Sequence, residues 1–234
     1  MDERILFLAI LTPTWALLFG AALLVQWRRH GTLEHWASPT VAVLLGHALI
    51  CSSLCVVYYA QTGLSLDHIG RANSSFANFL VANTLCCMMV DLVFAAALRT
   101  RHKQTYAHHV LTSLGALAVL YHNLSGWEFL LAVSTAELTF CFYLRRLLRM
   151  LDYDNERVLG IVAQGQTIGT ILVRGVIHPL LAVAVVSSEQ VMLAEKVLTV
   201  MFFALGAFWV FTLVRGRIAR ARRISTSSQP AAAC

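Results

Sequence analysis

The sequence has few charged residues for its length. Of its 234 residues only 13% are charged, 58% are hydrophobic, and the mean hydropathy is +0.69. Soluble domains are about 45–50% apolar and about 25% charged. The chain therefore has more apolar surface than a soluble core of this size can bury, which excludes the ordinary soluble class. The composition predicts an all-α, multi-pass membrane protein.

The sequence also lacks a cleavable signal-peptide pattern, a disulfide framework and a C-terminal prenylation motif. Its first residues, "MDERILFLAILTPTW", have no basic leading region, and the apolar run is too long for a signal peptide, so we expect a spanning helix there. Cys234 has no C-a-a-X context. The other cysteines lie within apolar runs and are expected to act as small hydrophobic residues: Cys51, Cys55, Cys86, Cys87 and Cys141.

Long apolar runs are what the sequence has instead. A helix needs about 20 such residues to cross about 30 Å of hydrocarbon. Seven segments are candidates: 5–27, 38–60, 78–98, 106–121, 127–143, 158–186 and 197–214. The "HNLSG" between the fourth and fifth predicts a tight turn and two antiparallel neighbours. Arg174, His178 and Pro179 interrupt the sixth, which predicts a tilt or kink there.

The chain is expected to form one domain with two flanking segments. Residues 1–37 would be the first spanning helix and a loop, 38–215 the main domain, and 216–234 a basic, disordered tail. That tail would lie near anionic lipid headgroups or act only as a stop-transfer signal.

The basic residues predict the orientation in the membrane. Fourteen of the eighteen lysines and arginines fall on one side of the seven candidate spans, three fall on the other, and Arg174 lies within a span. Because cytosolic loops are rich in Lys and Arg, we expect a lumenal N-terminus and a cytosolic C-terminus. Asn73 and Asn123, each in an N-x-S triplet, lie on the expected lumenal side.

Ionisable side chains within the spans are the strongest functional signal, because each costs about 2.5–3.5 kcal/mol at the centre of a membrane helix. The set comprises His47, Asp91, His108, His109, Glu137, Arg174 and His178. The expected topology places five of them, on four helices, in the cytosolic half of the membrane. The sequence therefore predicts that imidazoles and carboxylates meet in one polar cluster.

Helical geometry refines this expectation. His108 and His109 point about 100° apart, so only one of them can face Asp91 or Glu137 squarely. Ser134 shares a helical stripe with Glu137.

Each of these ionisable residues could instead have a purely structural role, without taking part in a functional site. His47 and His178 would then be hydrogen-bonded packing residues. Asp91 would pair with Arg99 or a histidine only to hold helices together, and Arg174 would extend toward water or neutralise Glu137.

Two stretches resemble a known family. "MMVDLVFAAALRTRHKQTYAHHVLTSLGALAVLYHN" and "LLAVSTAELTFCFYLRRLLRML" are similar to the TLC domain of translocating-chain-associating proteins and ceramide synthases. They share an Asp before a short basic loop, a His-His pair that opens the next helix, and an acidic residue further on. "ILVRGVIHP" is similar to the penultimate span of that family. The resemblance covers roughly residues 40–215 and is greatest to the small TLC-domain proteins.

The resemblance implies seven spans, six of them around a lipid-accessible cavity. In ceramide synthases the His pair and downstream Asp residues transfer an acyl group from acyl-CoA to a sphingoid amine. By that resemblance His108, His109, Glu137 and Asp91 are the candidate catalytic residues. In this chain a Glu replaces the first downstream Asp, and the stretch around Cys141 has no counterpart of the second. Candidate substrate-binding residues are His47, Arg174, Ser134, Arg99, Arg101 and Lys103.

Two functions from different classes follow. By this resemblance, we expect the chain to act in lipid homeostasis in the endoplasmic reticulum, either as an acyl-CoA-dependent acyltransferase or as a non-catalytic lipid-sensing or cargo scaffold. The expected partners are membrane lipids, acyl-CoA and a second copy of the chain. No cofactor, metal or nucleic acid is expected. Haem ligation by His47 and His109 is a weaker alternative, and a rhomboid-type protease is disfavoured because the one "GLS" triplet, 63–65, falls in a loop.

Overall fold

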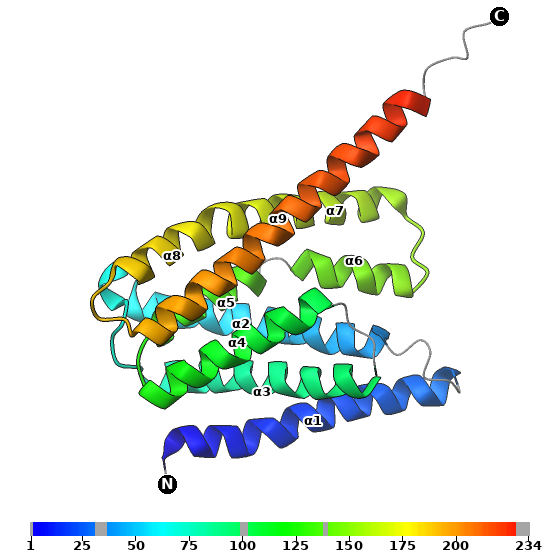
Figure 1. The fold of residues 1–234 in the computed structure, drawn as a ribbon. Coiled ribbons are helices and arrows are strands. Elements are labelled where there is room, and N and C mark those ends of the chain that lie inside the picture. Colours follow the sequence, from blue (N-terminus) through cyan, green and yellow to red (C-terminus); the bar gives the residue numbers. More distant parts are fainter. Residues whose placement is uncertain (1, 31–36, 99–102, 138–139, 228–234) are drawn as a thin grey trace, which may run out of the picture.

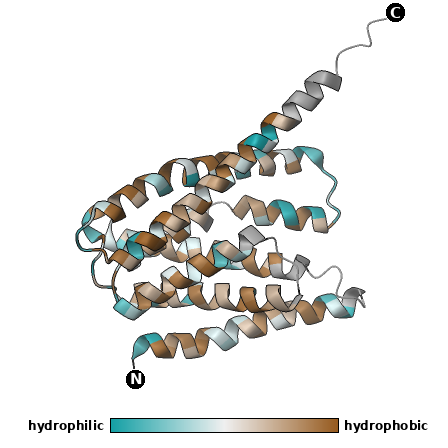
Figure 2. Cartoon of the chain, in the orientation of Figure 1, coloured by the Kyte–Doolittle hydropathy of each residue, from teal (hydrophilic) through white to brown (hydrophobic). Residues whose placement is uncertain are grey.

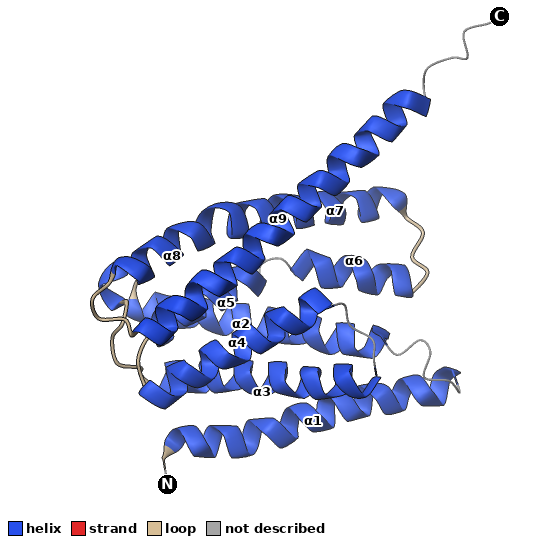
Figure 3. Cartoon of the chain, viewed as in Figure 1, coloured by secondary structure: helices blue, strands red, loops and turns tan. Residues whose placement is uncertain are grey.

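The computed structural model describes residues 2–30, 37–98, 103–137 and 140–227, with the side chains of 29–30, 37–40, 98, 103–105, 137 and 220–227 left out of the description. The described residues form helices and no strand (Figure 3), apart from an isolated bridge between Ala72 and Leu124. The all-helical prediction is therefore confirmed. The elements are α1 (Glu3–His30), α2 (Ala37–Thr62), η1 (Leu66–His68), α3 (Ser75–Leu98), α4 (Lys103–His122), α5 (Gly126–Glu137), α6 (Cys141–Met150), α7 (Glu156–Leu172), η3 (Val173–Ile177), α8 (His178–Ser187) and α9 (Leu193–Ser227).

The helices lie side by side as a bundle, with α1 on one flank and α9 crossing obliquely over α4 and the α7–α8 rod (Figure 1). We call one end of the bundle the turn end; it holds the loops 63–74, 123–125 and 188–192. The opposite end, where α6 finishes and α7 begins, is the basic end. The predicted tight turn is confirmed, because residues 123–125 join α4 directly to α5, with Asn123 and Ser125 at positive φ.

Six helical segments of the described chain are long and apolar enough to cross a membrane: Glu3–Arg28, Val41–Thr62, Ser75–Ala97, Gly126–Met150, Glu156–Ser187 and Leu193–Ala219. α4 is not among these six. Hydrophobic residues predominate along the outer helices (Figure 2), and Leu17 and Leu193 are 73% and 76% exposed. Surfaces of this kind are stable in hydrocarbon and unfavourable in water. The chain is an integral, multi-pass membrane protein.

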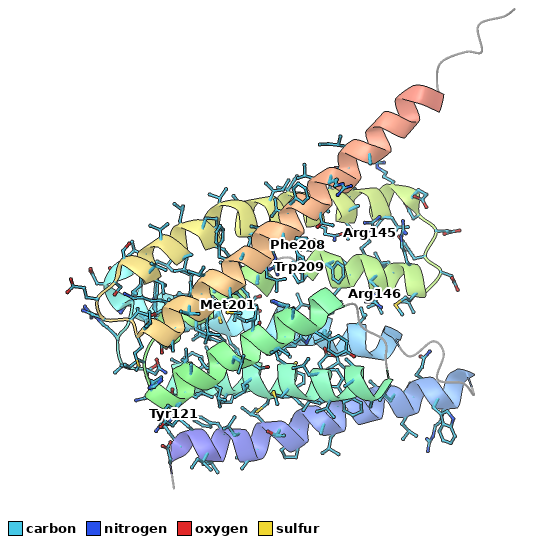
Figure 4. The ribbon with its side chains drawn as sticks, in the orientation of Figure 1. Tyr121, Arg145, Arg146, Met201, Phe208 and Trp209 are labelled. Carbon is cyan, nitrogen blue, oxygen red and sulfur yellow. The ribbon has the colours of Figure 1, made fainter. Side chains whose placement is uncertain are left out.

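The fifth apolar segment extends further than predicted. It consists of α5 and α6 and reaches Met150 rather than residue 143. Arg145 and Arg146 therefore lie on a helix of the bundle and not in a loop (Figure 4). The Arg145 guanidinium points toward α7, where its Nη1 donates to Gln166 Oε1 at 3.5 Å. Long arginine side chains tolerate this place because their aliphatic stems pack while their charged ends find polar partners.

The predicted interruption of the sixth span is present, in the form of a π-helical stretch. Residues Val173–Ile177 form one widened turn between α7 and α8, and Pro179 follows in the first turn of α8. Proline cannot donate the backbone hydrogen bond that an α-helix requires, and its ring crowds the carbonyl four residues earlier. One π-turn relieves this conflict without ending the helix.

The basic tail differs from its prediction over most of its length. α9 continues as helix to Ser227, whereas we expected disorder from residue 216. The helix is already nucleated in the apolar part of α9. The segment that follows is rich in Arg and Ala, which are good helix formers, so the helix propagates through it. The prediction for residues 228–234 lies outside the described residues.

Side-chain hydrogen bonds hold the turn end together. Asn73 Nδ2 donates to Asn78 Oδ1 at 3.0 Å and to the Val119 carbonyl at 3.4 Å, and Asn73 Oδ1 accepts from the Gly126 backbone N–H at 2.7 Å. One side chain thus connects α3, α4 and α5. Asn73 belongs to an N-x-S triplet, but its amide serves the packing of this end.

Arg4 attaches α1 to the same end, because its Nη1 donates to the Leu120 carbonyl at 2.5 Å. Its guanidinium also hydrogen-bonds Asp2, which lowers the pKa of that exposed carboxyl to about 2.

We predict that Gly126→Ala destabilises the protein. A Cβ at position 126 would lie 2.5 Å from Asn73 Oδ1, so the asparagine must move and lose its bonds. The expected loss is about 1–3 kcal/mol of unfolding free energy, measured by thermal unfolding of the purified protein in detergent. Gly160→Ala is the control, because nothing lies within 4 Å of a Cβ there. Equal stability of both variants would contradict this account of the turn end.

Candidate functional site

A buried carboxylate–imidazole pair joins α3 to α4. His109 Nδ1 lies 2.9 Å from Asp91 Oδ2. Both side chains are buried, with 2% and 1% of their surface exposed. α3 supplies the acid seven residues before its end at Leu98, and α4 supplies the imidazole from its second turn. Because neither group is solvated by bulk water, their contact replaces part of the hydration that each loses on burial.

His108 points to a different neighbour, as the helical step predicts. Its ring packs against Phe202 and Trp209 of α9, with centroid distances of 5.4 and 5.2 Å. It also lies 5.6 Å from the ring of His109. Its buried Nδ1 has no hydrogen-bond partner among the described residues. One histidine of the pair therefore faces the carboxylate and the other faces an aromatic wall.

Arg174 approaches the same aromatic wall from the π-helical stretch η3. The side chain is buried, and its guanidinium carbon lies 4.2 Å from the centre of the Trp209 ring. Gly206 of α9 lies against its aliphatic stem, so a residue without a side chain lets the two elements approach closely. A cation stacked on indole is attracted to the ring, and the attraction strengthens when water is excluded.

His178 is held by hydrogen bonds. Its Nε2 lies 3.1 Å from Thr135 Oγ1 and 3.1 Å from the Ala132 carbonyl oxygen, both on α5. A carbonyl only accepts, so the contact with Ala132 is satisfied when Nε2 carries the proton. Nδ1 is then an acceptor, and the described residues offer it no partner. The ring also packs against Phe202 at 5.7 Å.

We call Asp91, His108, His109, Arg174 and His178 the polar cluster. Its members come from α3, α4, η3 and α8, and the aromatic residues Phe202 and Trp209 of α9 connect three of them. Figure 4 shows Trp209 on α9, on the side that faces α4 and α6.

Two other predicted residues lie apart from these contacts. His47 of α2 is buried edge-on against Trp15 of α1, at 5.3 Å, so one of its neighbours is a helix outside the cluster. Ser134 Oγ donates to the Leu131 carbonyl at 3.4 Å, a bond within its own helix.

Four predicted residues cannot be placed. Arg99 and Arg101 lie outside the described residues, and so do the side chains of Lys103 and Glu137.

A cavity of about 90 Å³ begins beside the polar cluster and extends toward the turn end. Phe202, which packs on His108 and His178, is part of its wall, as is Thr112, one turn after His109. The walls come from four helices: Leu111, Gly115 and Val119 of α4, Phe129, Ala132 and Val133 of α5, Leu181 and Val185 of α8, and Leu198 and Thr199 of α9.

Sequence reasoning missed two carboxylates of this cavity, Glu128 and Glu195. Both line its wall and are buried, although each lies within one turn of a helix start. Residues this close to a helix start carry no burial signal in the sequence, because their burial follows from the packing of the loops at the turn end. Phe202 and Trp209 were also missed, although their seven-residue spacing places them on one helix face.

We predict energetic coupling between Asp91 and His109. Asp91→Ala should lower the unfolding free energy by about 3–5 kcal/mol, because it leaves a buried imidazole without its partner. His109→Ala should also destabilise, and the double variant should cost less than the sum of the two. Chemical unfolding in mixed micelles measures all three, with His122→Ala, a partly exposed histidine of the same helix, as control. Strict additivity would show that the pair carries no interaction energy.

No family model, curated protein or solved structure matches this chain. The resemblance to the TLC family therefore stays a prediction from the sequence.

Proposed function

We propose that the chain is a lipid-handling enzyme of the membrane that transfers an acyl group from acyl-CoA to an amine or hydroxyl of a lipid. The observation that supports this most is the contact of His109 with Asp91 beside a cavity with apolar walls. A carboxylate next to Nδ1 favours the tautomer with the proton on that nitrogen. The opposite nitrogen, Nε2, is then a proton acceptor.

The reaction would proceed with His109 as general base. Nε2 takes the proton of the acceptor amine or hydroxyl while its nitrogen or oxygen attacks the thioester carbonyl. An amide or ester bond forms and the carbon–sulfur bond breaks. The imidazolium returns its proton to the CoA thiolate, which leaves as the thiol. Asp91 stabilises the imidazolium between these two transfers.

The rest of the polar cluster has roles that suit this reaction. Arg174 places a positive charge beside His108, where it would attract the negative charge that develops on the thioester oxygen. The apolar walls of the cavity would hold part of an alkyl chain. Glu137, Arg99, Arg101 and Lys103 keep their sequence-based assignments, Glu137 to catalysis and the three basic residues to the charged CoA headgroup.

The proposal includes the topology expected from the sequence. α4 would be the seventh spanning helix, six helices would surround a cavity open to lipid, the N-terminus would be lumenal, and the basic end would face the cytosol of the endoplasmic reticulum. In that orientation the polar cluster lies on the side from which acyl-CoA arrives.

The alternative is a non-catalytic lipid-binding scaffold. The stacking of Arg174 on Trp209 and the two hydrogen bonds of His178 favour it, because these contacts form without a substrate. In such a protein the cluster would bind a headgroup and no bond would be made.

We predict that His109→Ala abolishes the lipid products that the protein forms. Cells that lack the protein would be complemented with the wild type, with His109→Ala, or with His122→Ala as the matched control. The expected loss is about 100-fold or more in product, because general-base catalysis contributes about 10²–10⁴-fold. Mass spectrometry of total lipids measures it, alongside the amount of folded protein. Wild-type lipid profiles with a folded His109→Ala protein would exclude the enzyme and leave the scaffold.

A further inference from the structure

The cavity ends in two acidic side chains that the proposed reaction does not use. Glu128 Oε1 accepts from the Gly70 backbone N–H at 2.9 Å, and Glu195 Oε2 accepts from the Ser125 hydroxyl at 2.6 Å. Both glutamates line the same cavity, as does Ser125. We call Glu128, Glu195 and Ser125 the acidic end of the cavity. It lies at the turn end of the bundle, where the loop that carries Gly70 packs over it.

The other oxygen of each carboxyl is buried and has no partner among the described residues: Glu128 Oε2 and Glu195 Oε1. Only 5% and 6% of these two residues is exposed, and both line the cavity. Thr112 adds an independent observation, because its hydroxyl is also buried, unpartnered within the described chain, and part of the same wall. Unsatisfied buried polar atoms are costly, so several around one cavity indicate a site suited to a polar ligand.

Charge identifies the kind of ligand. Among the described residues, those that line the cavity include two carboxylates and no Lys, Arg or His. Two buried negative charges without a counter-charge are strongly unfavourable. A cation placed between the two free oxygens would offset this cost, and a cation with N–H groups would donate a hydrogen bond to each of them.

The apolar walls favour an organic cation over a metal ion. Calcium takes six to eight oxygen ligands and magnesium requires an octahedron. No third acidic side chain, histidine or cysteine joins the two glutamates in the part of the chain that the structure describes. A primary ammonium needs fewer partners, since it has three N–H donors. Its alkyl chain would also match the apolar side chains of the four helices, which a metal ion would not.

We propose that the acidic end of the cavity binds the ammonium group of an amphiphile whose alkyl chain lies along the apolar walls toward Phe202. The cavity of about 90 Å³ accommodates a headgroup and the first few carbons. α4 runs about 20 Å from His109 to His122, next to the turn that bears Ser125. An amine held at the acidic end is therefore too distant for His109 to deprotonate. The site is a second binding site, separate from the proposed acyl transfer.

The test uses the purified full-length protein in nanodiscs of uncharged phosphatidylcholine at pH 7. Its unfolding temperature would be measured with n-hexylamine, with n-hexanol and with calcium chloride. At about 100 times the dissociation constant, n-hexylamine should raise the unfolding temperature by about 5 °C or more. Hexanol has the same chain without the charge and should have less than a third of this effect. This comparison needs no variant, so it does not depend on how well a variant folds.

Variants then locate the site. Glu128→Gln and Glu195→Gln should each reduce the amine effect at least fivefold. Glu189→Gln is the matched control, because this exposed residue belongs to the loop before α9 and does not line the cavity. Its response to hexylamine should equal that of the wild type.

Three results would overturn the proposal. They are equal effects of the amine and the alcohol, an amine effect that survives when both glutamates are replaced, and stabilisation by calcium in place of the amine. None of these measurements depends on chemistry at His109. The ammonium site and the acyl transfer therefore fail or succeed separately.

Discussion

Polar side chains inside this bundle need polar partners within the protein, because the bilayer offers no water to replace them. The contact between Asp91 and His109 meets this requirement across α3 and α4. It fixes the register of those helices and the direction in which His109 points. His108, one residue earlier, is thereby turned toward α9, where Trp209 also receives Arg174. One carboxylate–imidazole contact thus organises the interior near the basic end.

The interior is divided between two chemically different ends. Near the basic end, imidazoles and a guanidinium pack around aromatic rings of α9. At the turn end, Glu128 and Glu195 are held by a backbone N–H and a hydroxyl, with one oxygen of each left over. The apolar cavity extends from Glu128 and Glu195 to Phe202, the ring that packs on His108 and His178. This difference between the two ends suits an elongated amphiphile better than a round ligand, and both proposals depend on it.

Much of the fold was predictable because hydrophobic length is a local property. Apolar runs located the helices, and Pro179 marked the interruption that became a π-turn. The sequence did not predict that the fifth segment continues through α6, because a charged residue such as Arg145 indicates the end of a span. Arg145 finds its partner on α7 only after folding. In the site, the helical step correctly separated His108 from His109. The sequence did not identify Glu128 and Glu195 as site residues. Their burial depends on the packing of loops 63–74 and 188–192 over them, and no local sequence pattern encodes that packing.

The tautomer of His109 is the most direct test of whether Asp91 holds the proton of this imidazole on Nδ1. The protein would be labelled with ¹⁵N-histidine, and its ring nitrogens observed by NMR in nanodiscs, with His109→Gln used to assign the signal. The account predicts a neutral ring with the proton on Nδ1 and a bare Nε2, and loss of that preference in Asp91→Asn. A His109 ring that carries its proton on Nε2 in the wild type would contradict it.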